Sequence, residues 1–327
     1  MLALVYNEIL KVVRKKRFYV VLAILAVLIP VFTYAQYKNT MEQQKRLGTK
    51  DWRTIVQQEI VDLQNRLTSA RLTDEWRRLL KIRLQQRQYY LDHDINPFAP
   101  GGVTFARVFL ERSASLFVPL LVVVVAADMV SGEHTGGTIK LLLTRPVRRW
   151  KILLSKYLAL LLFVSLIIAA TVLLAYLISG LVFGYSGWTM PVLTGFQIAG
   201  ETVRTDRVHV LPQGLYLLMQ AGLVWYATVI VATLSFLLSV LLRSTAAAMG
   251  TMLSALIAGV ILTEMVSSWQ TAKYLFVVNL QLTDYLAGNA PPIEGMTLPF
   301  SLAVLSVWGA AALLAAFWVF TRQDMLT

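Results

Sequence analysis

The chain has 327 residues, of which 57% are hydrophobic and only 15% are charged, whereas a soluble domain has about 25% charged residues. A soluble fold of this length needs a polar surface, so the composition excludes an ordinary soluble protein and predicts an integral membrane protein. The formal charge of +12 favours an anionic lipid surface over nucleic acid as the partner, because no nucleic-acid-binding motif accompanies the basic residues. The absence of cysteine excludes disulfides and zinc–thiolate sites.

The N-terminal part of the chain combines a basic segment with a long apolar run. Residues 1–17 are predicted to form a cytoplasmic, amphipathic and basic segment. Residues 18–37 are apolar for long enough to cross about 30 Å of hydrocarbon as a helix. No convincing small-residue cleavage site lies near the end of this run, so we interpret it as a retained signal anchor and the first transmembrane helix.

A long charged segment, residues 38–104, follows the first apolar run. Val56 and Ile60 belong to a series of apolar residues at helical spacing. Thr73 is typical of a helix N-cap, because two acidic residues follow it in the first turn of a second amphipathic pattern. The segment therefore predicts an extracytoplasmic helical hairpin between the first and second transmembrane helices.

The rest of the chain alternates apolar runs with polar connections. Five further runs are predicted to span the membrane: 105–128, 152–183, 214–242, 246–268 and 298–320. The connections are a cytoplasmic segment at 129–151, outer loops at 184–213 and 269–297, and a cytoplasmic tail at 321–327. The expected fold is thus an all-α integral membrane protein with about six transmembrane helices.

The distribution of lysine and arginine predicts the orientation of these helices. Basic residues gather at the N-terminus, in 129–151, at Arg243 and at Arg322, whereas 184–213 and 269–297 contain few. Short loops rich in Lys and Arg remain in the cytoplasm, and a loop as long as 38–104 largely escapes this rule. We therefore expect a multi-pass protein of the cell membrane with both termini in the cytoplasm.

The most informative stretch, residues 128–157, joins the second and third predicted spans. Its glycines permit a turn close to the membrane. Thr138 to Thr144 is predicted to form a short amphipathic helix, which Pro146 ends because proline cannot continue the backbone ladder. The candidate coupling residues of this stretch are Asp128, Ser131, Gly132, Glu133, Gly137, Thr138, Arg145, Pro146, Arg148 and Arg149.

This series without Arg145 and Arg149, together with Leu141 to Leu143 and Lys156, resembles the signature region of the ABC-2 family of exporter permeases. The resemblance implies that the segment docks on a separate ATPase subunit and transmits its nucleotide-driven movement to the membrane helices. It implies two ATPase copies, which carry the ATP and Mg, and a second permease copy in a homodimer or heterodimer. A braced helix containing Glu133 and a basic cluster suits charge-assisted docking.

A simpler interpretation of part of this stretch is also open. Arg145, Arg148 and Arg149 could anchor the third helix at the lipid headgroups and set the topology. The chain contains no G-x-x-x-x-G-K-[ST] phosphate loop, so it cannot hold ATP by that device. We accordingly expect no enzymatic activity and no cofactor in this chain.

Ionisable residues near the lipid are the candidate pathway residues. Glu264 lies in the fifth predicted span, and Arg107 and Glu111 lie four residues apart at the start of the second, where they share one helix face. Such residues mark transport pathways or gates by default. The alternative is that they extend to the interface and have only a structural role.

Three other classes of membrane protein differ from the exporter subunit in what their sequences require. An intramembrane protease or lipid-modifying enzyme needs paired acids, histidines or a Ser/Lys dyad at membrane depth, which the sequence does not offer. An ion-driven transporter usually has more spans. A membrane-anchored sensor or binding protein that uses the 38–104 hairpin remains the alternative to the exporter subunit.

Overall fold

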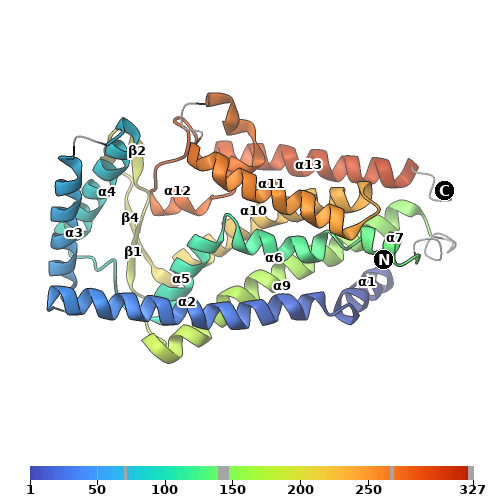
Figure 1. Ribbon diagram of the computed structural model, residues 1–327, viewed down its shortest axis with the longest axis horizontal. Coiled ribbons are helices and arrows are strands. Elements are labelled where there is room, and N and C mark those ends of the chain that lie inside the picture. Colours follow the sequence, from blue (N-terminus) through green and yellow to red (C-terminus); the bar gives the residue numbers. More distant parts are fainter. Residues whose placement is uncertain (50, 70–71, 139–146, 266–268, 323–327) are drawn as a thin grey trace.

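The computed structural model describes residues 1–49, 51–69, 72–138, 147–265 and 269–322. The long helices lie side by side in one elongated bundle (Figure 1). One end, here called the terminal end, holds α1 (Leu2–Arg14), α7 (Ser131–Thr135) and the last turn of α13 (Leu298–Arg322). The opposite end, here called the hairpin end, holds α3 (Trp52–Leu67) and α4 (Asp74–Asp92).

Membrane-spanning helices make up most of the bundle. Within the described residues, five helices are long and apolar enough to cross a bilayer. They are α2 (Arg17–Leu47), α9 (Arg149–Phe183), α10 (Gln213–Leu241), α11 (Thr245–Met265) and α13. A bent pair, α5 (Gly102–Ser113) and α6 (Phe117–Ala126), raises the number to six if it counts as one span. The chain is a multi-pass, largely helical membrane protein.

The second predicted span, 105–128, is not one straight helix. Helices α5 and α6 meet at an angle of 67°. Pro119, in the first turn of α6, has no N–H to donate, and its ring would collide with the carbonyl of Ser115 if the helix continued. The break over residues 114–116 therefore lies where proline would otherwise disrupt the helical ladder.

The first span is longer than the apolar run predicts. Helix α2 continues from residue 37 to Leu47 and ends at Gly48, whose φ is +65°, a conformation that glycine adopts without cost. At its other end, Lys16 has a φ of 59° and joins α1 to α2. Helix α1 thus leaves the line of α2 at the terminal end (Figure 1).

The hairpin end also contains two short pairs of strands within residues 184–213, which were predicted only as an outer loop. Strand β1 (Pro191–Thr194) pairs antiparallel with β4 (His209–Pro212), and β2 (Gln197–Ala199) pairs with β3 (Thr202–Arg204). Gly200, at a φ of +63°, begins the two-residue turn between β2 and β3, as such tight hairpins require. The side chain of Gln85 on α4 binds both Glu201 and Val203, so the strands pack against the charged hairpin.

Short helices occupy the second loop of the hairpin end, between α11 and α13. They are η1 (Gln270–Tyr274), η2 (Phe276–Asn279) and α12 (Thr283–Ala287). In the core, α5 and α9 approach closely: a Cβ on Gly102 would lie 3.1 Å from the Cα of Gly180. Such small-residue contacts let membrane helices pack without a side chain between the backbones.

Candidate functional site

A group of seven charged side chains lies at the terminal end of the bundle. We call it the charge cluster, and it consists of Glu8, Lys11, Lys15, Arg17, Asp128, Glu133 and Lys156. Glu8, Lys11 and Lys15 are three and four residues apart, so α1 presents them on one face. The cluster joins α1, the start of α2, the segment around α7, and α9.

The inner part of the cluster is a ring of two acids and two lysines. Lys11 Nζ donates to Glu8 Oε1 and to Glu133 Oε1, each at 2.7 Å. Lys156 Nζ lies 2.8 Å from Glu8 Oε2 and 2.6 Å from Glu133 Oε1. Lys156 is completely buried, and Glu8 and Glu133 are each only 5% exposed. Each charge therefore has two opposite charges as neighbours, which offsets the cost of removing it from water.

The second part of the cluster surrounds Asp128. Its carboxylate lies 2.8 Å from Lys15 Nζ and 3.0 Å from Arg17 Nη2. Thr245, the first residue of α11, donates to Asp128 Oδ1 at 3.3 Å. Asp128 thus links the junction of α1 and α2 with the start of α11.

The backbone between Asp128 and Glu133 is fixed by further contacts. Ser239 Oγ on α10 accepts the N–H groups of Val130 and Ser131 at 3.0 and 2.9 Å. Gly132 packs against Asp128 so closely that a Cβ there would overlap its carboxylate and lie 2.7 Å from Lys15 Nζ. Only glycine fits at this position with the surrounding side chains in place.

The ion pairs shift the pKa values of Glu133 and Lys11, two members of the charge cluster that lie outside the membrane-spanning helices. Burial acts to raise the pKa of Glu133, but the charge of Lys156 and hydrogen bonds from both lysines outweigh it, so the pKa lies below the ordinary 4.5. Burial acts to lower the pKa of Lys11, but its bonds to Glu133 and Glu8 raise it above 10.5. Both groups therefore stay charged at neutral pH.

The other predicted coupling residues lie at the edges of this cluster or beyond the described residues. Gly137 has a φ of +65°, and the N–H of the exposed Thr138 donates to the carbonyl of Glu133. Arg148 is exposed at the N-cap of α9, and Arg149 Nη1 lies 3.5 Å from the Thr321 carbonyl. Two of the predicted residues, Arg145 and Pro146, lie outside the described residues. Of the predicted coupling helix, Thr138 to Thr144, only Thr138 is described.

The structure changes the role of Glu133. The sequence suggested that its carboxylate could contact a partner surface, whereas the structure pairs it with Lys11 and Lys156 inside the chain. From the sequence, Lys11, Lys15 and Arg17 counted only as basic residues that set the topology, and Glu8 had no assigned role. The single acid Glu8 among these basic residues was the signal that could have indicated a buried network.

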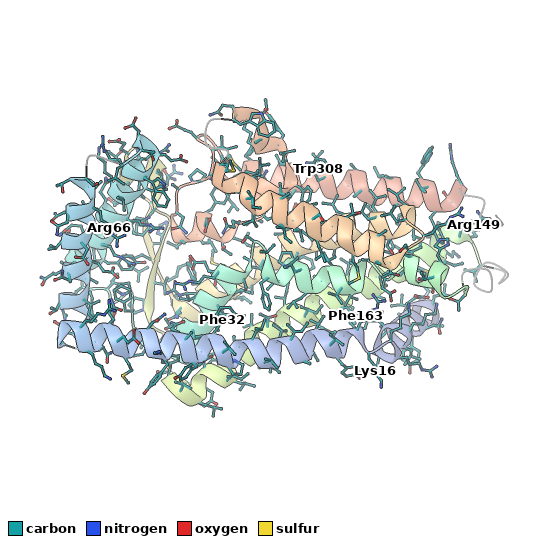
Figure 2. All side chains as sticks on the ribbon, in the orientation of Figure 1. Lys16, Phe32, Arg66, Arg149, Phe163 and Trp308 are labelled. Carbon is teal, nitrogen blue, oxygen red and sulfur yellow. The ribbon has the colours of Figure 1, made fainter. Side chains whose placement is uncertain are left out.

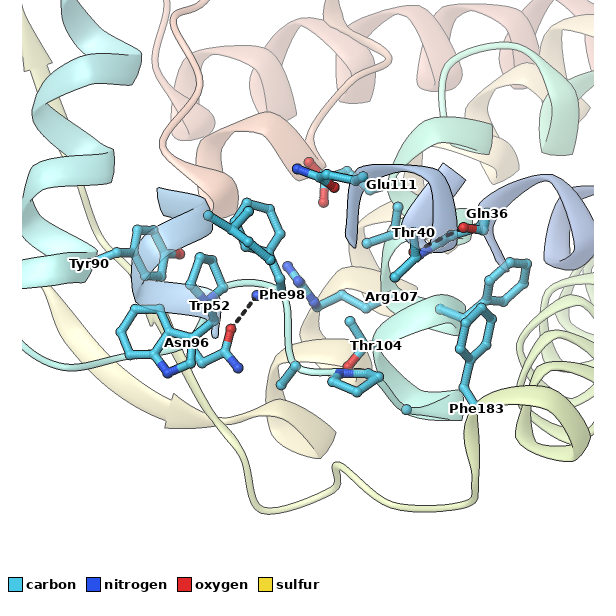
Figure 3. A pocket seen from close by; sticks show the side chains of 18 of the residues that line it. Gln36, Thr40, Trp52, Tyr90, Asn96, Phe98, Thr104, Arg107, Glu111 and Phe183 are labelled. Carbon is cyan, nitrogen blue, oxygen red and sulfur yellow. Dashed lines mark hydrogen bonds between the residues drawn. The ribbon is translucent and has the colours of Figure 1, made fainter. Parts of the chain in front are cut away.

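The candidate pathway residues lie at the hairpin end. Arg107 and Glu111 line a cavity of about 860 Å³ between α2, α4 and α5 (Figure 3). Glu264 belongs to the last turn of α11, and its side chain is outside the described part of the structure. Among the described residues, no three His, Asp or Glu side chains converge as metal ligands would.

Comparison with known proteins gives the family. Residues 84–326 match a family described as "Protein of unknown function (DUF2705)". The chain belongs to the DUF2705 family. This DUF2705 match begins within α4 and covers Asp128, Glu133 and Lys156, but not α1.

Two relatives from Bacillus subtilis (strain 168) are similar to this sequence. The "Uncharacterized protein YhcI" is 28% identical over 337 residues, which are 99% of each chain. The "Uncharacterized membrane protein YdbK" is 27% identical over 215 residues, or 65% of this chain and 80% of the relative. The membrane location of this DUF2705 chain is thus consistent with the description of YdbK as a membrane protein.

Proposed function

We propose that this chain is the membrane-spanning permease subunit of an ATP-driven ABC exporter, resembling the ABC-2 family. It lies in the cell membrane with both termini in the cytoplasm and the 38–104 hairpin outside. Two copies of the chain, or this chain and a close homologue, form the translocation pathway, and two separate ATPase subunits supply the energy.

The observation that carries this proposal is the bracing of the described parts of the 128–157 segment, residues 128–138 and 147–157, at the terminal end. Glu133 on the N-terminal side of the segment is tied to α1 and α9 through Lys11 and Lys156. On the C-terminal side, Arg149 begins α9 and reaches the end of α13. A force applied between these two points passes into α1, α9 and α13 together, because both sides are fixed to helices.

The charge of the segment suits an acidic docking surface. Arg148 is exposed at the start of α9 and is followed by Arg149 and Lys151. The buried acids are already neutralised by the lysines, so the segment offers a partner mainly positive charge. Complementary charge across an interface speeds association and fixes its register.

The test uses the full chain co-expressed with an ABC-type ATPase encoded in the same gene neighbourhood. Arg148→Ala should lower the ATP turnover of the purified complex about tenfold, because it removes an exposed charge from the docking surface. Arg66→Ala, which removes an exposed arginine at the hairpin end, is the matched control. Failure of the native chain to assemble with the ATPase, or equal turnover in both variants, would contradict the proposal.

A binding protein that uses the hairpin is the second candidate. The observation in its favour is the cavity of about 860 Å³ beneath α3 and α4, a volume within the range of small-molecule sites. This candidate is compatible with the first, since a permease can also recognise a ligand on its outer side. If the chain bound a ligand in this cavity but never assembled with an ATPase, only the binding-protein candidate would be supported.

A further inference from the structure

The cavity at the hairpin end lies where the C-terminal part of helix α2 faces α5. Gln36, Thr40 and Gln44 of α2 form one side, and Arg107 and Glu111 of α5 form the other. Figure 3 shows Arg107 and Glu111 near the middle of the cavity, with Trp52 and Tyr90 toward α3 and α4. The cavity therefore extends from the level of the membrane helices to the charged hairpin.

The charge lining this cavity is unbalanced. Its described wall contains four arginines, Arg83, Arg87, Arg107 and Arg112, but only one acid, Glu111. Arg87 is already paired with Glu59, at 2.9 Å. None of the other three arginines has an ion pair within 4 Å among the described residues. A concave surface with this excess of positive charge attracts anions.

Arg107 is half-buried on α5. Its Nε is buried without a hydrogen-bond partner among the described residues, and its guanidinium lies 5.6 Å from the centre of the Tyr216 ring. A buried donor without a partner is costly and calls for a ligand or another explanation. Guanidinium groups bind phosphate and carboxylate oxygens with paired hydrogen bonds.

The wall beside Arg107 is apolar. Phe105 and Val108 of α5, Tyr37 of α2 and Phe183 of α9 line the same cavity. The rings of Tyr37 and Phe183 lie with their centres 6.3 Å apart, and Tyr37 is exposed. A ligand that places an anionic group at Arg107 would therefore place an adjoining hydrocarbon or aromatic part against these side chains.

We propose that this cavity binds an anionic amphiphile whose phosphate or carboxylate group contacts Arg107 and whose apolar part packs on Tyr37 and Phe183. Glu111 limits the charge of the ligand, because a second negative charge would lie near its carboxylate. The assignment does not depend on the coupling to an ATPase and is measured without one.

The test is native mass spectrometry of the full chain in a neutral detergent, with dihexanoyl-phosphatidylglycerol as the anionic probe. Dihexanoyl-phosphatidylcholine has the same tails without the net charge, and inorganic phosphate has the charge without the tails. The native chain should bind phosphatidylglycerol about tenfold more tightly than either comparison compound. Arg107→Gln should weaken that binding about 10- to 100-fold, and Arg66→Gln should leave it unchanged.

A second variant separates the proposal from simple misfolding. Glu111→Gln removes a negative charge from the same helix face and should strengthen phosphatidylglycerol binding severalfold. Two substitutions four residues apart would then change affinity in opposite directions, which loss of the fold cannot produce. Equal binding of the two lipids, or native affinity in Arg107→Gln, would overturn the anion site. Inorganic phosphate binding as tightly as phosphatidylglycerol would overturn the amphiphile assignment.

Discussion

The ammonium nitrogen of Lys156 lies 2.6 Å from a carboxylate oxygen of Glu133. Both residues belong to the part of the sequence that resembles the ABC-2 signature, and Lys156 is completely buried. The contact shows that this stretch folds back on itself at the terminal end. Glu133 and Lys156 hold α7 against α9. The exposed basic residues of the stretch, such as Arg148, are the ones available to the proposed partner.

Removal of the Lys156 charge should destabilise the terminal end. Lys156→Met keeps the length of the side chain but leaves Glu8 and Glu133 with one lysine between them, and breaking a buried pair in this way costs about 3–5 kcal/mol. Lys151→Met, one turn earlier on α9, is the matched control and should cost less than about 1 kcal/mol. Unfolding of both variants in detergent measures the difference. Equal stability of the two variants would contradict the structural role of the cluster.

The contact between α1 and α9 should persist over a wide pH range. The pKa of Glu133 lies below its ordinary 4.5, so its contribution is present above that value and is lost as the pH falls through the folded-state pKa. The pKa of Lys11 lies above 10.5, so its contribution is present below that value and is lost as the pH rises further.

A distance between two labels tests this pH range. Spin labels at the exposed residues Tyr6 of α1 and Leu158 of α9 should keep one narrow distance from about pH 5 to about pH 10, and it should broaden outside that range. Glu133→Gln should broaden it at neutral pH. A native chain whose α1 separates from α9 near pH 7 would contradict the assigned pKa directions.

A methyl group at Gly132 should disturb the contacts of Asp128. Gly132→Ala places a Cβ against the Asp128 carboxylate and Lys15 Nζ, and such overpacking typically costs about 1–3 kcal/mol. Gly250→Ala on α11 is the control, because a Cβ there meets nothing within 4 Å; it should be neutral or slightly stabilising. Thermal unfolding in detergent compares them. A Gly132→Ala variant as stable as Gly250→Ala would show that Asp128 can move away freely.

The absence of native cysteine allows a direct test of orientation. Arg66 and Arg149 lie at opposite ends of the molecule (Figure 2). Arg66→Cys should react with a membrane-impermeant maleimide in intact cells, whereas Arg148→Cys, next to Arg149, should react only after permeabilisation. The reverse pattern would place both termini outside and end the proposal that residues 128–157 meet an ATPase in the cytoplasm.

Hydropathy predicted the long helices because lipid requires about 20 apolar residues for each crossing. It could not predict their continuity. Pro119 lies beside the break between α5 and α6, whereas Pro30 lies within the single helix α2. Proline alone therefore did not distinguish a bend from an intact span. The extension of α2 to Leu47 was missed because most of its last ten residues are polar or charged, and helix formation there does not depend on lipid.

The charge cluster was beyond local sequence patterns. Glu8 and Lys156 are 148 residues apart, and the basic residues near the N-terminus have a sufficient explanation in the positive-inside rule. The strands of 184–213 were missed because each has only three or four residues, too few to show alternation. The N-cap at Thr73, in contrast, depends on neighbouring residues, and the structure confirms it.

Helix α2 is a single helix of 31 residues, which at 1.5 Å per residue is about 46 Å long. Its first residue, Arg17, contacts Asp128, and its later residues Gln36 and Thr40 line the cavity at the hairpin end. A single helix that contacts both places can transmit a movement from one to the other. If α2 tilts about its centre, Arg17 and Thr40 move in opposite directions. A ligand in the cavity and a protein bound at the terminal end would then each alter the binding site of the other.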